Sequence, residues 1–222
     1  MQQFDVAVIG AGSGGLTAAV GLAKIGKRVL LIERDKIGGE CTHSGCIPSK
    51  ALLHHAKAYA TAVAIAGIND HTEKFRQDAF AYVQAKIAET VATETPEHFT
   101  AIGVTVIYGE AIITGPRSLS IGNEQYSFTR AIIATGSSPR LIAIPGLHPA
   151  DVLTNQNLFR LAEIPKRTLI IGGGPIGLEM GQAFALLGSQ VTIVDTGATL
   201  VDKSNLDEFV KARDSATTKN PS

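Results

Sequence analysis

The sequence predicts an α/β fold in which helices pack on a mainly parallel β-sheet. A strand, a glycine-rich turn, a helix and a second strand that ends in an acid follow one another twice, near residue 4 and near residue 168. Both copies have the same internal spacing, since 33 − 10 and 195 − 172 are both 23. In addition, 45% of the residues are hydrophobic and only 18% are charged, which suits a sheet that is buried on both faces.

Length and charge exclude several classes of protein. The chain has 222 residues, enough for a sizeable core, and its 20 basic residues balance its 20 acidic residues. No basic field is therefore expected to attract nucleic acid or an anionic membrane. No apolar run has membrane-spanning length, and the start of the sequence has no charged leader before an apolar core, so we expect a cytoplasmic protein.

The first copy of the repeated pattern has all the parts of a dinucleotide-binding fingerprint. Residues 4–9 predict a strand, residues 10–15 form the turn Gly-Ala-Gly-Ser-Gly-Gly, a helix is expected to residue 25, and residues 29–32 predict a second strand before Glu33. The alternative is a glycine-rich turn in some other βαβ unit.

Each residue of this fingerprint has a physical reason to be there. Gly10 allows the tight turn, Gly12 lets a pyrophosphate approach the backbone at the helix start, and Gly15 permits close packing of helix on strand. Ser13 and Gly14 complete the predicted phosphate-binding turn. Glu33 would accept hydrogen bonds from the hydroxyl groups of an adenosine ribose.

The sequence contains only two cysteines, Cys41 and Cys46, and they lie close together. Such a pair indicates a redox disulfide or two ligands of a metal site. Residues five apart on a regular helix are separated by about 7.5 Å of axial rise, so a disulfide requires a distorted turn, for which Gly45 and Pro48 are suited. The positive end of a helix dipole is expected to lower the pKa of these thiols.

Residues 38–50, Gly-Gly-Glu-Cys-Thr-His-Ser-Gly-Cys-Ile-Pro-Ser-Lys, resemble the active-site signature of the class I pyridine nucleotide-disulfide oxidoreductases. This family includes dihydrolipoamide dehydrogenase, glutathione reductase and mercuric reductase. The resemblance implies that Cys41 is the interchange thiol, that Cys46 is the charge-transfer thiol against the flavin, and that Lys50 lies near flavin N5. It also implies a cofactor contact at Gly39.

One position departs from the family pattern, because His43 stands where members commonly have Asn. The departure leaves the cysteine pair intact and bears on the substrate. Two alternatives to a redox pair are a structural disulfide and a metal site formed by Cys41, His43 and Cys46.

The middle of the chain predicts two helices and a small antiparallel β-meander. Residues 48–66 form the first predicted helix, and apolar residues recurring every four positions over residues 75–91 predict the second. Short strands with turn residues between them predict the meander at about 104–128, followed by a buried strand at 130–134.

Two segments here are similar to flavin contacts of the same family. Gly109-Glu-Ala111 resembles the backbone contact to the adenine of FAD. The segment that contains Thr135, Gly136 and Ser137 resembles the Ala-Thr-Gly segment that closes the flavin domain. We therefore expect Ala111 and residues 135–137 to contact the cofactor.

The second copy of the fingerprint follows a proline-containing linker. Residues 168–171 predict a strand, Gly172-Gly-Gly174-Pro-Ile-Gly177 is the turn, and a helix and a strand lead to Asp195. Two fingerprints indicate two cofactors, and the resemblance assigns FAD to the first and NAD(P) to the second. Asp195 suits the free 2′-hydroxyl of NAD better than the phosphate of NADP.

The helix of the second copy begins with a further candidate residue, Glu179. In the family, the glutamate just after this turn pairs with the lysine of the disulfide motif, so the resemblance implies an ion pair between Glu179 and Lys50. The alternative is an exposed glutamate that complements the helix dipole.

These patterns predict four segments. They are an FAD-binding domain at 1–144, a linker at 145–166, a partial Rossmann-like NAD(P)-binding unit at 167–195 and a polar tail at 196–222. In the tail, one weak helix is expected from Leu200, Val201, Leu206, Phe209 and Val210. Ahead of it, the strand at 191–194 is expected to leave an unpaired sheet edge.

The leading hypothesis is a shortened flavin-dependent oxidoreductase of three-layer Rossmann-like fold. It would move electrons from NAD(P)H through FAD to Cys41 and Cys46, and then to a small-molecule or protein disulfide or to a metal substrate. The resemblance implies homodimeric full-length relatives whose dimerisation domain, with its His-Glu acid/base pair, is not visible here. The alternatives are an FAD-binding module without independent catalysis and a thiol–metal binding protein.

Overall fold

The computed structural model describes residues 2–141, 144–195 and 200–201, which form two compact units. The first unit contains the residues up to Pro48 together with Val83–Arg160. The second contains Ser49–Tyr82 and the described residues from Leu161 onward. This division cuts across the order of the chain, and the sequential boundaries at residues 144 and 166 stay predictions.

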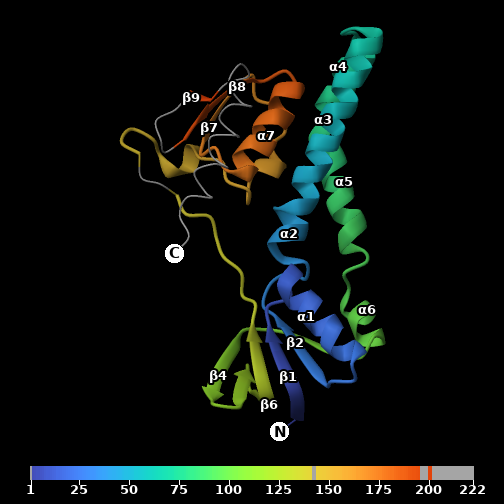
Figure 1. Ribbon diagram of the computed structural model, residues 1–222, viewed down its shortest axis with the longest axis vertical. Helices are drawn as coiled ribbons and strands as arrows, with labels where there is room; N and C mark the ends of the chain where they lie inside the picture. Colours follow the sequence, from blue (N-terminus) through green and yellow to red (C-terminus); the bar gives the residue numbers. More distant parts are fainter. Residues whose placement is uncertain (1, 142–143, 196–199, 202–222) are drawn as a thin grey trace, which may run out of the picture. The chain divides into compact units, whose positions relative to one another are not determined.

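The first unit is built on a six-stranded sheet in the order β3-β2-β1-β6-β5-β4 (Figure 1). Its strands are β1 (Gln2–Ile9), β2 (Val29–Glu33), β3 (Val104–Tyr108), β4 (Ala111–Gly115), β5 (Ser118–Ile121) and β6 (Glu124–Ile133). Its helical segments are α1 (Ser13–Lys24), α2 (Gly39–His43), α6 (Pro96–Ala101) and the short 3₁₀ turns Pro149–Asp151 and Leu158–Arg160. Helices α3 (Cys46–Ala66) and α5 (Ala79–Val91) run from one unit into the other.

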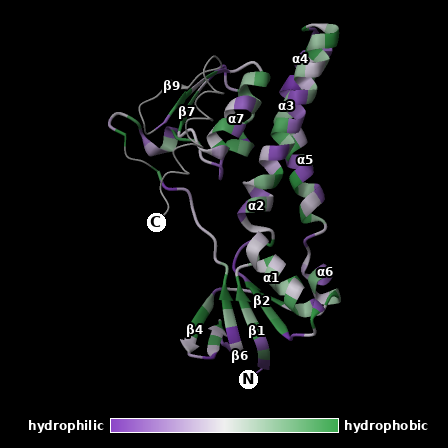
Figure 2. Cartoon of the chain, in the orientation of Figure 1, coloured by the Kyte–Doolittle hydropathy of each residue, from purple (hydrophilic) through white to green (hydrophobic). Residues whose placement is uncertain are grey.

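Strand β2 shows why this sheet is buried on both faces. Its first four residues, Val-Leu-Leu-Ile, are all apolar and at most 1% exposed. Alternate side chains point to opposite faces of a strand. Val29 and Leu31 accordingly join one core cluster, and Leu30 and Ile32 join the other. Figure 2 shows the central strands coloured mainly as hydrophobic.

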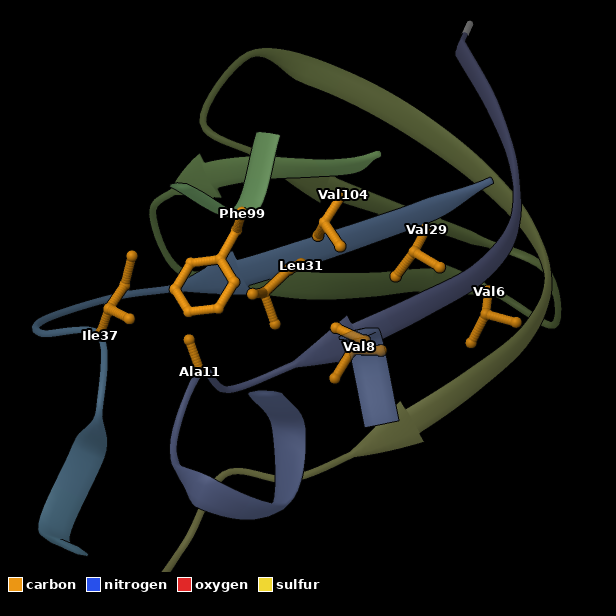
Figure 3. Close-up of a cluster of buried hydrophobic side chains, with 9 residues drawn as sticks. Val6, Val8, Ala11, Val29, Leu31, Ile37, Phe99 and Val104 are labelled. Atoms are coloured by element: carbon orange, nitrogen blue, oxygen red, sulfur yellow. The ribbon is translucent and has the colours of Figure 1, made fainter. Parts of the chain in front are cut away.

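The two core clusters give the unit its three layers. On one face, Val8, Leu31 and Val104 pack with Ala19 of α1 and Phe99 of α6 (Figure 3). The other face carries a second cluster, which joins side chains of β1 and β2 to side chains of the meander: Phe4, Ala7, Leu30, Ile32, Leu119, Ile121, Tyr126 and Phe128. The α/β fold with a parallel sheet and a small antiparallel meander is therefore confirmed.

The meander differs from the prediction in its extent. β3, at Val104–Tyr108, does not belong to it, because β3 pairs in parallel with β2. The antiparallel part consists of β4, β5 and β6. The end of the expected meander and the strand expected at 130–134 are one strand, β6, in which residues 124–127 pair with β5 and residues 126–133 pair with β1. A single continuous strand thus connects the meander to the parallel sheet.

The second unit repeats the strand–turn–helix–strand pattern. β7 (Arg167–Ile171) and β8 (Gln190–Val194) are parallel, and α7 (Pro175–Leu186) connects them. Gly181 of α7 allows the helix to pack closely, since a Cβ there would lie 2.9 Å from Ile193 Cδ1. This is the partial second Rossmann-like unit that the sequence predicts.

The expected helix after Asp195 is wrong for its first two residues. Leu200 and Val201 form β9 (Leu200–Val201), which pairs antiparallel with β8. The pairing Ile193↔Val201 and Val194↔Leu200 covers part of the sheet edge that was expected to stay unpaired. The other residues of that predicted helix, and the rest of the predicted tail at 196–222, lie outside the described residues.

The helix expected over residues 75–91 is also interrupted. α4 (Asp70–Gln77) ends at Asp78, and α5 begins at Ala79. Asp78 binds Lys74 of the preceding turn, with 2.6 Å between Lys74 Nζ and Asp78 Oδ1.

Within the described ranges, no helix combines the length and the apolar character that a membrane crossing requires.

Gly15 and Gly14 provide a matched test of the packing that begins α1. A Cβ at Gly15 would overlap the carbonyl oxygen of Gly10, whereas a Cβ at Gly14 would meet nothing within 4 Å. We expect Gly15→Ala to lower the free energy of unfolding by about 1–3 kcal/mol, measured from urea denaturation curves. Gly14→Ala should be neutral or stabilising by up to ~1 kcal/mol. Equal unfolding midpoints for the two variants would contradict this packing.

Candidate functional site

The first glycine turn leaves the start of α1 open to a ligand. Gly10 has φ +103°, and a Cβ there would overlap the carbonyl oxygen of Ala134. Gly12 is the N-cap of α1, where a Cβ would come no closer than 3.8 Å to its nearest neighbour, Gly39 Cα. The backbone N–H groups at this helix start can therefore receive a phosphate, as its positive dipole end favours.

Glu33 is held at the end of β2 by the backbone around it. Its Oε2 accepts a hydrogen bond from Ala11 N at 2.7 Å, and its Oε1 accepts one from Asp35 N at 2.8 Å. Each carboxylate oxygen has a further lone pair, so the fixed carboxylate can still accept hydrogen bonds from a ribose.

A cavity of about 940 Å³ extends from this turn through the first unit. This volume is at the upper end of the range for ligand sites, which suits a long ligand. Its wall includes eight of the predicted cofactor residues: Gly10, Gly12, Glu33, Gly39, Ala111, Thr135, Gly136 and Ser137. Ser13, Gly14 and Gly15 belong to α1 and do not line it. An open helix start, a fixed ribose acceptor and a large cavity together fit FAD.

The cavity wall also contains cations that the sequence reading missed. They are Arg34, Lys36 and Arg160. Arg34 and Lys36 follow Glu33 directly in the sequence, so their proximity to the fingerprint acid was a usable signal. Arg160 lies far along the chain and carries no such local signal.

The cysteines lie on two helices, the short α2 and the long α3, which are separated by a break. Cys41 is in α2, Ser44 caps that helix, and Cys46 begins α3. A Cβ at Gly45 would lie 2.9 Å from Glu40 O and 3.2 Å from Cys41 Cα. The missing side chain of Gly45 thus lets the chain turn back against Cys41, which is the distortion that a disulfide between these positions needs.

Cys46 is exposed and Cys41 is half-buried. Burial raises the pKa of the Cys41 thiol, and a hydrogen bond with the Cys46 side chain and its charge act in the same direction. A hydrogen bond from the Cys46 backbone N–H lowers that pKa but does not reverse the shift. The expectation that a helix dipole lowers the thiol pKa is therefore wrong for Cys41, because burial and the second sulfur outweigh it.

Neither cysteine lines the cavity, although neighbours of both do. Glu40 precedes Cys41, His43 and Ser44 lie between the two cysteines, and all three are wall residues. His43 Nε2 lies 2.8 Å from Ile37 O.

Across the described part of the chain, no three His, Cys, Asp or Glu side chains gather where they could hold a metal ion.

The second unit contains the ion pair implied by the resemblance. Lys50 Nζ lies 2.9 Å from Glu179 Oε1 and 2.9 Å from Oε2. The Lys50 side chain is 67% exposed and that of Glu179 is 19% exposed. Lys50 follows Cys46 by four residues in α3, about one helical turn, so both positions lie on the same side of that helix.

The second glycine turn has the same geometry as the first. Gly172 has φ +111°, and a Cβ at Gly177 would overlap the Gly172 carbonyl oxygen. Gly174 is the N-cap of α7 and has open space around its Cβ position. Asp195 Oδ1 accepts a hydrogen bond from Gly173 N at 3.0 Å, as Glu33 does from Ala11.

Together these features define a dinucleotide-binding protein of Rossmann-like fold with a cysteine pair next to its cavity. A family model described as pyridine nucleotide-disulphide oxidoreductase matches residues 4–220. The chain therefore belongs to the pyridine nucleotide-disulphide oxidoreductase family, a family of FAD-dependent oxidoreductases that use NAD(P)H. The resemblance that the cysteine motif predicts is confirmed.

Curated relatives include two kinds of enzyme. The chain is 35% identical over 202 residues to the dihydrolipoyl dehydrogenase of Chlorobaculum parvum. This match covers 87% of this chain and 43% of that relative. It is 31% identical over 201 residues to the mercuric reductase of Bacillus cereus, covering 89% of this chain and 32% of that relative. The chain thus spans less than half the length of these relatives.

Solved structures show the same partial coverage. The HOCl-induced flavoprotein disulfide reductase RclA from Escherichia coli, in a Cu(II) complex, matches with a TM-score of 0.73 and 30% identity. This match covers 95% of our chain and 47% of RclA.

Gly45→Ala tests whether the close turn brings the two thiols together. Because the added methyl group would press on Glu40 O and the Cys41 backbone, we expect oxidation of the reduced protein by diamide to form the intramolecular disulfide about tenfold more slowly. Loss of free thiols over time, followed with Ellman's reagent, gives the rate. Gly21→Ala is the control, since its Cβ position in α1 has nothing within 4 Å. Equal rates in both variants would show that Gly45 does not set the approach of the thiols.

Proposed function

We propose that this chain holds FAD in the cavity of the first unit and passes electrons from NAD(P)H to the pair Cys41 and Cys46. The observation that supports this most strongly is a backbone connection between the phosphate-binding turn and the cysteine loop. Gly38 N donates to Ala11 O at 2.9 Å, and a Cβ at Gly39 would lie 2.7 Å from Gly12 Cα. A dinucleotide seated on Gly12 would therefore lie beside the segment that leads into Cys41.

Named wall residues would hold the parts of FAD. Gly12 at the start of α1 would receive the pyrophosphate, and Glu33 would accept hydrogen bonds from the adenosine ribose. Ala111 would contact the adenine through its backbone, as the family resemblance implies. The segment of Thr135, Gly136 and Ser137 would close the cavity wall.

FAD, when bound, supplies a two-electron carrier between a nicotinamide and a disulfide. The protein's part is the cysteine pair. Reduction of the Cys41–Cys46 bond takes two electrons and one proton and leaves one thiol and one thiolate. Lys50, which Glu179 orients, is the cation that we propose to stand by the flavin ring and offset negative charge there.

The reduced pair would then act on a disulfide substrate by thiol–disulfide exchange. The Cys41 thiolate attacks one substrate sulfur and displaces the other as a thiolate, which takes up a proton. Cys46 attacks the resulting mixed disulfide, restores the Cys41–Cys46 bond and releases the reduced substrate. The substrate class that we propose is a small-molecule or protein disulfide, and a thiol-binding metal is a second possibility because a mercuric reductase is among the relatives.

We propose NAD as the preferred nicotinamide cofactor. The Asp195 carboxylate is fixed by Gly173 N and retains lone pairs for the ribose 2′-hydroxyl. A 2′-phosphate at the same place would meet a negative charge at close range, which disfavours NADP.

A second candidate function is an FAD-binding module that needs another polypeptide for catalysis. The match covers 43% of the dihydrolipoyl dehydrogenase relative, and the acid/base pair implied by the resemblance is not among the site residues described above. The homodimer and the His-Glu acid/base implied by the resemblance stay predictions. The two functions differ in whether NADH reduces the bound flavin of this chain alone.

Gly12→Val tests the FAD site without disturbing the fold. The Cβ position of Gly12 is open and its φ of −76° suits any residue, so the variant should fold. Its side chain would occupy the place of the pyrophosphate, and we expect FAD to bind at least about tenfold more weakly, or ~1.4 kcal/mol, by fluorescence titration of the apoprotein. The control is Gly21→Val, on the exposed side of the same helix. Unchanged FAD affinity in Gly12→Val would refute the proposed site.

Gly174→Val tests the nicotinamide site in the same way. We expect anaerobic NADH to bleach the visible absorbance of the FAD-loaded chain, and about tenfold higher NADH concentrations to be needed in Gly174→Val, with FAD affinity unchanged. NADPH should act more weakly than NADH on the unsubstituted chain. Bound flavin that dithionite reduces and NADH does not would favour the module.

A further inference from the structure

Glu94 reaches the cysteine loop from a distant part of the sequence. It follows the end of α5 by three residues, and its Oε2 accepts a hydrogen bond of 2.9 Å from Thr42 Oγ1. Thr42 follows Cys41 directly in α2 and is only 3% exposed. A partly buried carboxylate is thus anchored to the turn of helix that carries one of the two thiols.

The space around this contact admits no side chain at the start of α2. Gly38, the N-cap of α2, has φ +94°. A Cβ there would overlap Glu94 Oε2 and would lie 2.6 Å from Thr42 Oγ1. Glu94 therefore packs against Gly38 at the start of α2 and also accepts the hydrogen bond from Thr42.

The charge of Glu94 acts on Cys41. It raises the pKa of the Cys41 thiol, in the same direction as burial and the Cys46 side chain. Two other side chains of the loop are engaged elsewhere, since Glu40 binds Asn155 and His43 Nε2 lies 2.8 Å from Ile37 O. Partial burial weakens the screening of the Glu94 carboxylate by water.

We propose that Glu94 is a positioning residue for the cysteine pair: through Thr42 it holds the α2 turn that carries Cys41, and its carboxylate disfavours negative charge on the Cys41 sulfur. The inference deepens the proposed function and rests on it, because Glu94 would set the position and the thiolate fraction of Cys41, the thiol that we propose to attack the substrate.

The test is the pH dependence of alkylation of the reduced 222-residue chain by iodoacetamide, which reacts with the thiolate. Both cysteines lie on one tryptic peptide, residues 37–50, and tandem mass spectrometry assigns each label. Glu94→Gln keeps an acceptor for Thr42 and removes the charge. Since the Glu94 charge raises the Cys41 pKa, its removal lowers that pKa, and we expect about threefold faster labelling of Cys41 at pH 7.

Three variants serve as controls. Glu97→Gln removes one negative charge three residues from Glu94. The Glu97 charge does not contribute to the raised pKa of Cys41, so this variant should leave the pH profile of Cys41 labelling unchanged. Thr42→Val removes the anchoring donor and should move the profile in the direction of Glu94→Gln by a smaller amount. Thr42→Ser keeps the donor and should restore the original profile.

Coincident Cys41 profiles for Glu94→Gln and Glu97→Gln would overturn the inference. A lower unfolding temperature of Glu94→Gln with an unchanged pH profile of Cys41 labelling would also overturn it. That result would show that the contact between Thr42 and Glu94 only stabilises the fold. Labelling needs neither flavin nor NADH, so a chain that fails to bind FAD still gives a result, and failure of the proposed function is distinguished from failure of this inference.

Discussion

The close approach of two backbone segments at Gly12 and Gly38–Gly39 is the constraint on which the rest of the site depends. Gly12 and Gly38 form an isolated parallel bridge, and Gly39 leaves no room for a Cβ against Gly12 Cα. The starts of α1 and α2 consequently meet, and α2 carries Cys41. A side chain at Gly39 would push the two helix starts apart. The turn that can receive a pyrophosphate and the loop that carries a thiol are thereby fixed to each other by backbone alone.

The two glycine turns show what this constraint adds to a common frame. In both, the first glycine donates to the end of the second strand, Gly10 N to Ile32 O at 2.8 Å and Gly172 N to Val194 O at 2.7 Å. In both, the acid near the end of that strand accepts a hydrogen bond from the backbone N–H of the residue after the first glycine. Glu33 accepts from Ala11, and Asp195 accepts from Gly173. The segment after Glu33 returns to its glycine turn and carries the two cysteines of the sequence. One backbone frame is therefore used twice, and the cysteine pair is attached to the first copy, where we propose that FAD binds.

Local patterns in the sequence predict much of this structure, and long-range pairing explains the misses. The glycine turns, β1, β2, α1 and α7 are specified by residues within one short segment, so their types and order follow from the sequence. The strand that pairs with β3 does not follow from the local sequence, because an apolar strand of five residues suits an antiparallel meander and a parallel sheet equally well. The break at Asp78 lies inside a continuous apolar pattern. In the site, Thr42 and Glu94 are 52 residues apart and neither stands in a motif, so only the folded chain brings them together.

The ion pair of Lys50 and Glu179 joins residues that are 129 positions apart, yet its strength is small. With Lys50 67% exposed, water screens the charges, and such pairs contribute about 0–1 kcal/mol to stability. Burial of Phe184 and Leu187, which are at most 1% exposed, stabilises the second unit far more. The pair therefore contributes little to holding α3 near α7. What it does is select one orientation of a flexible ammonium group, because a carboxylate that is only 19% exposed offers both oxygens at 2.9 Å. A cation fixed in this way is available to offset charge on a bound group, which a freely rotating lysine would do less well.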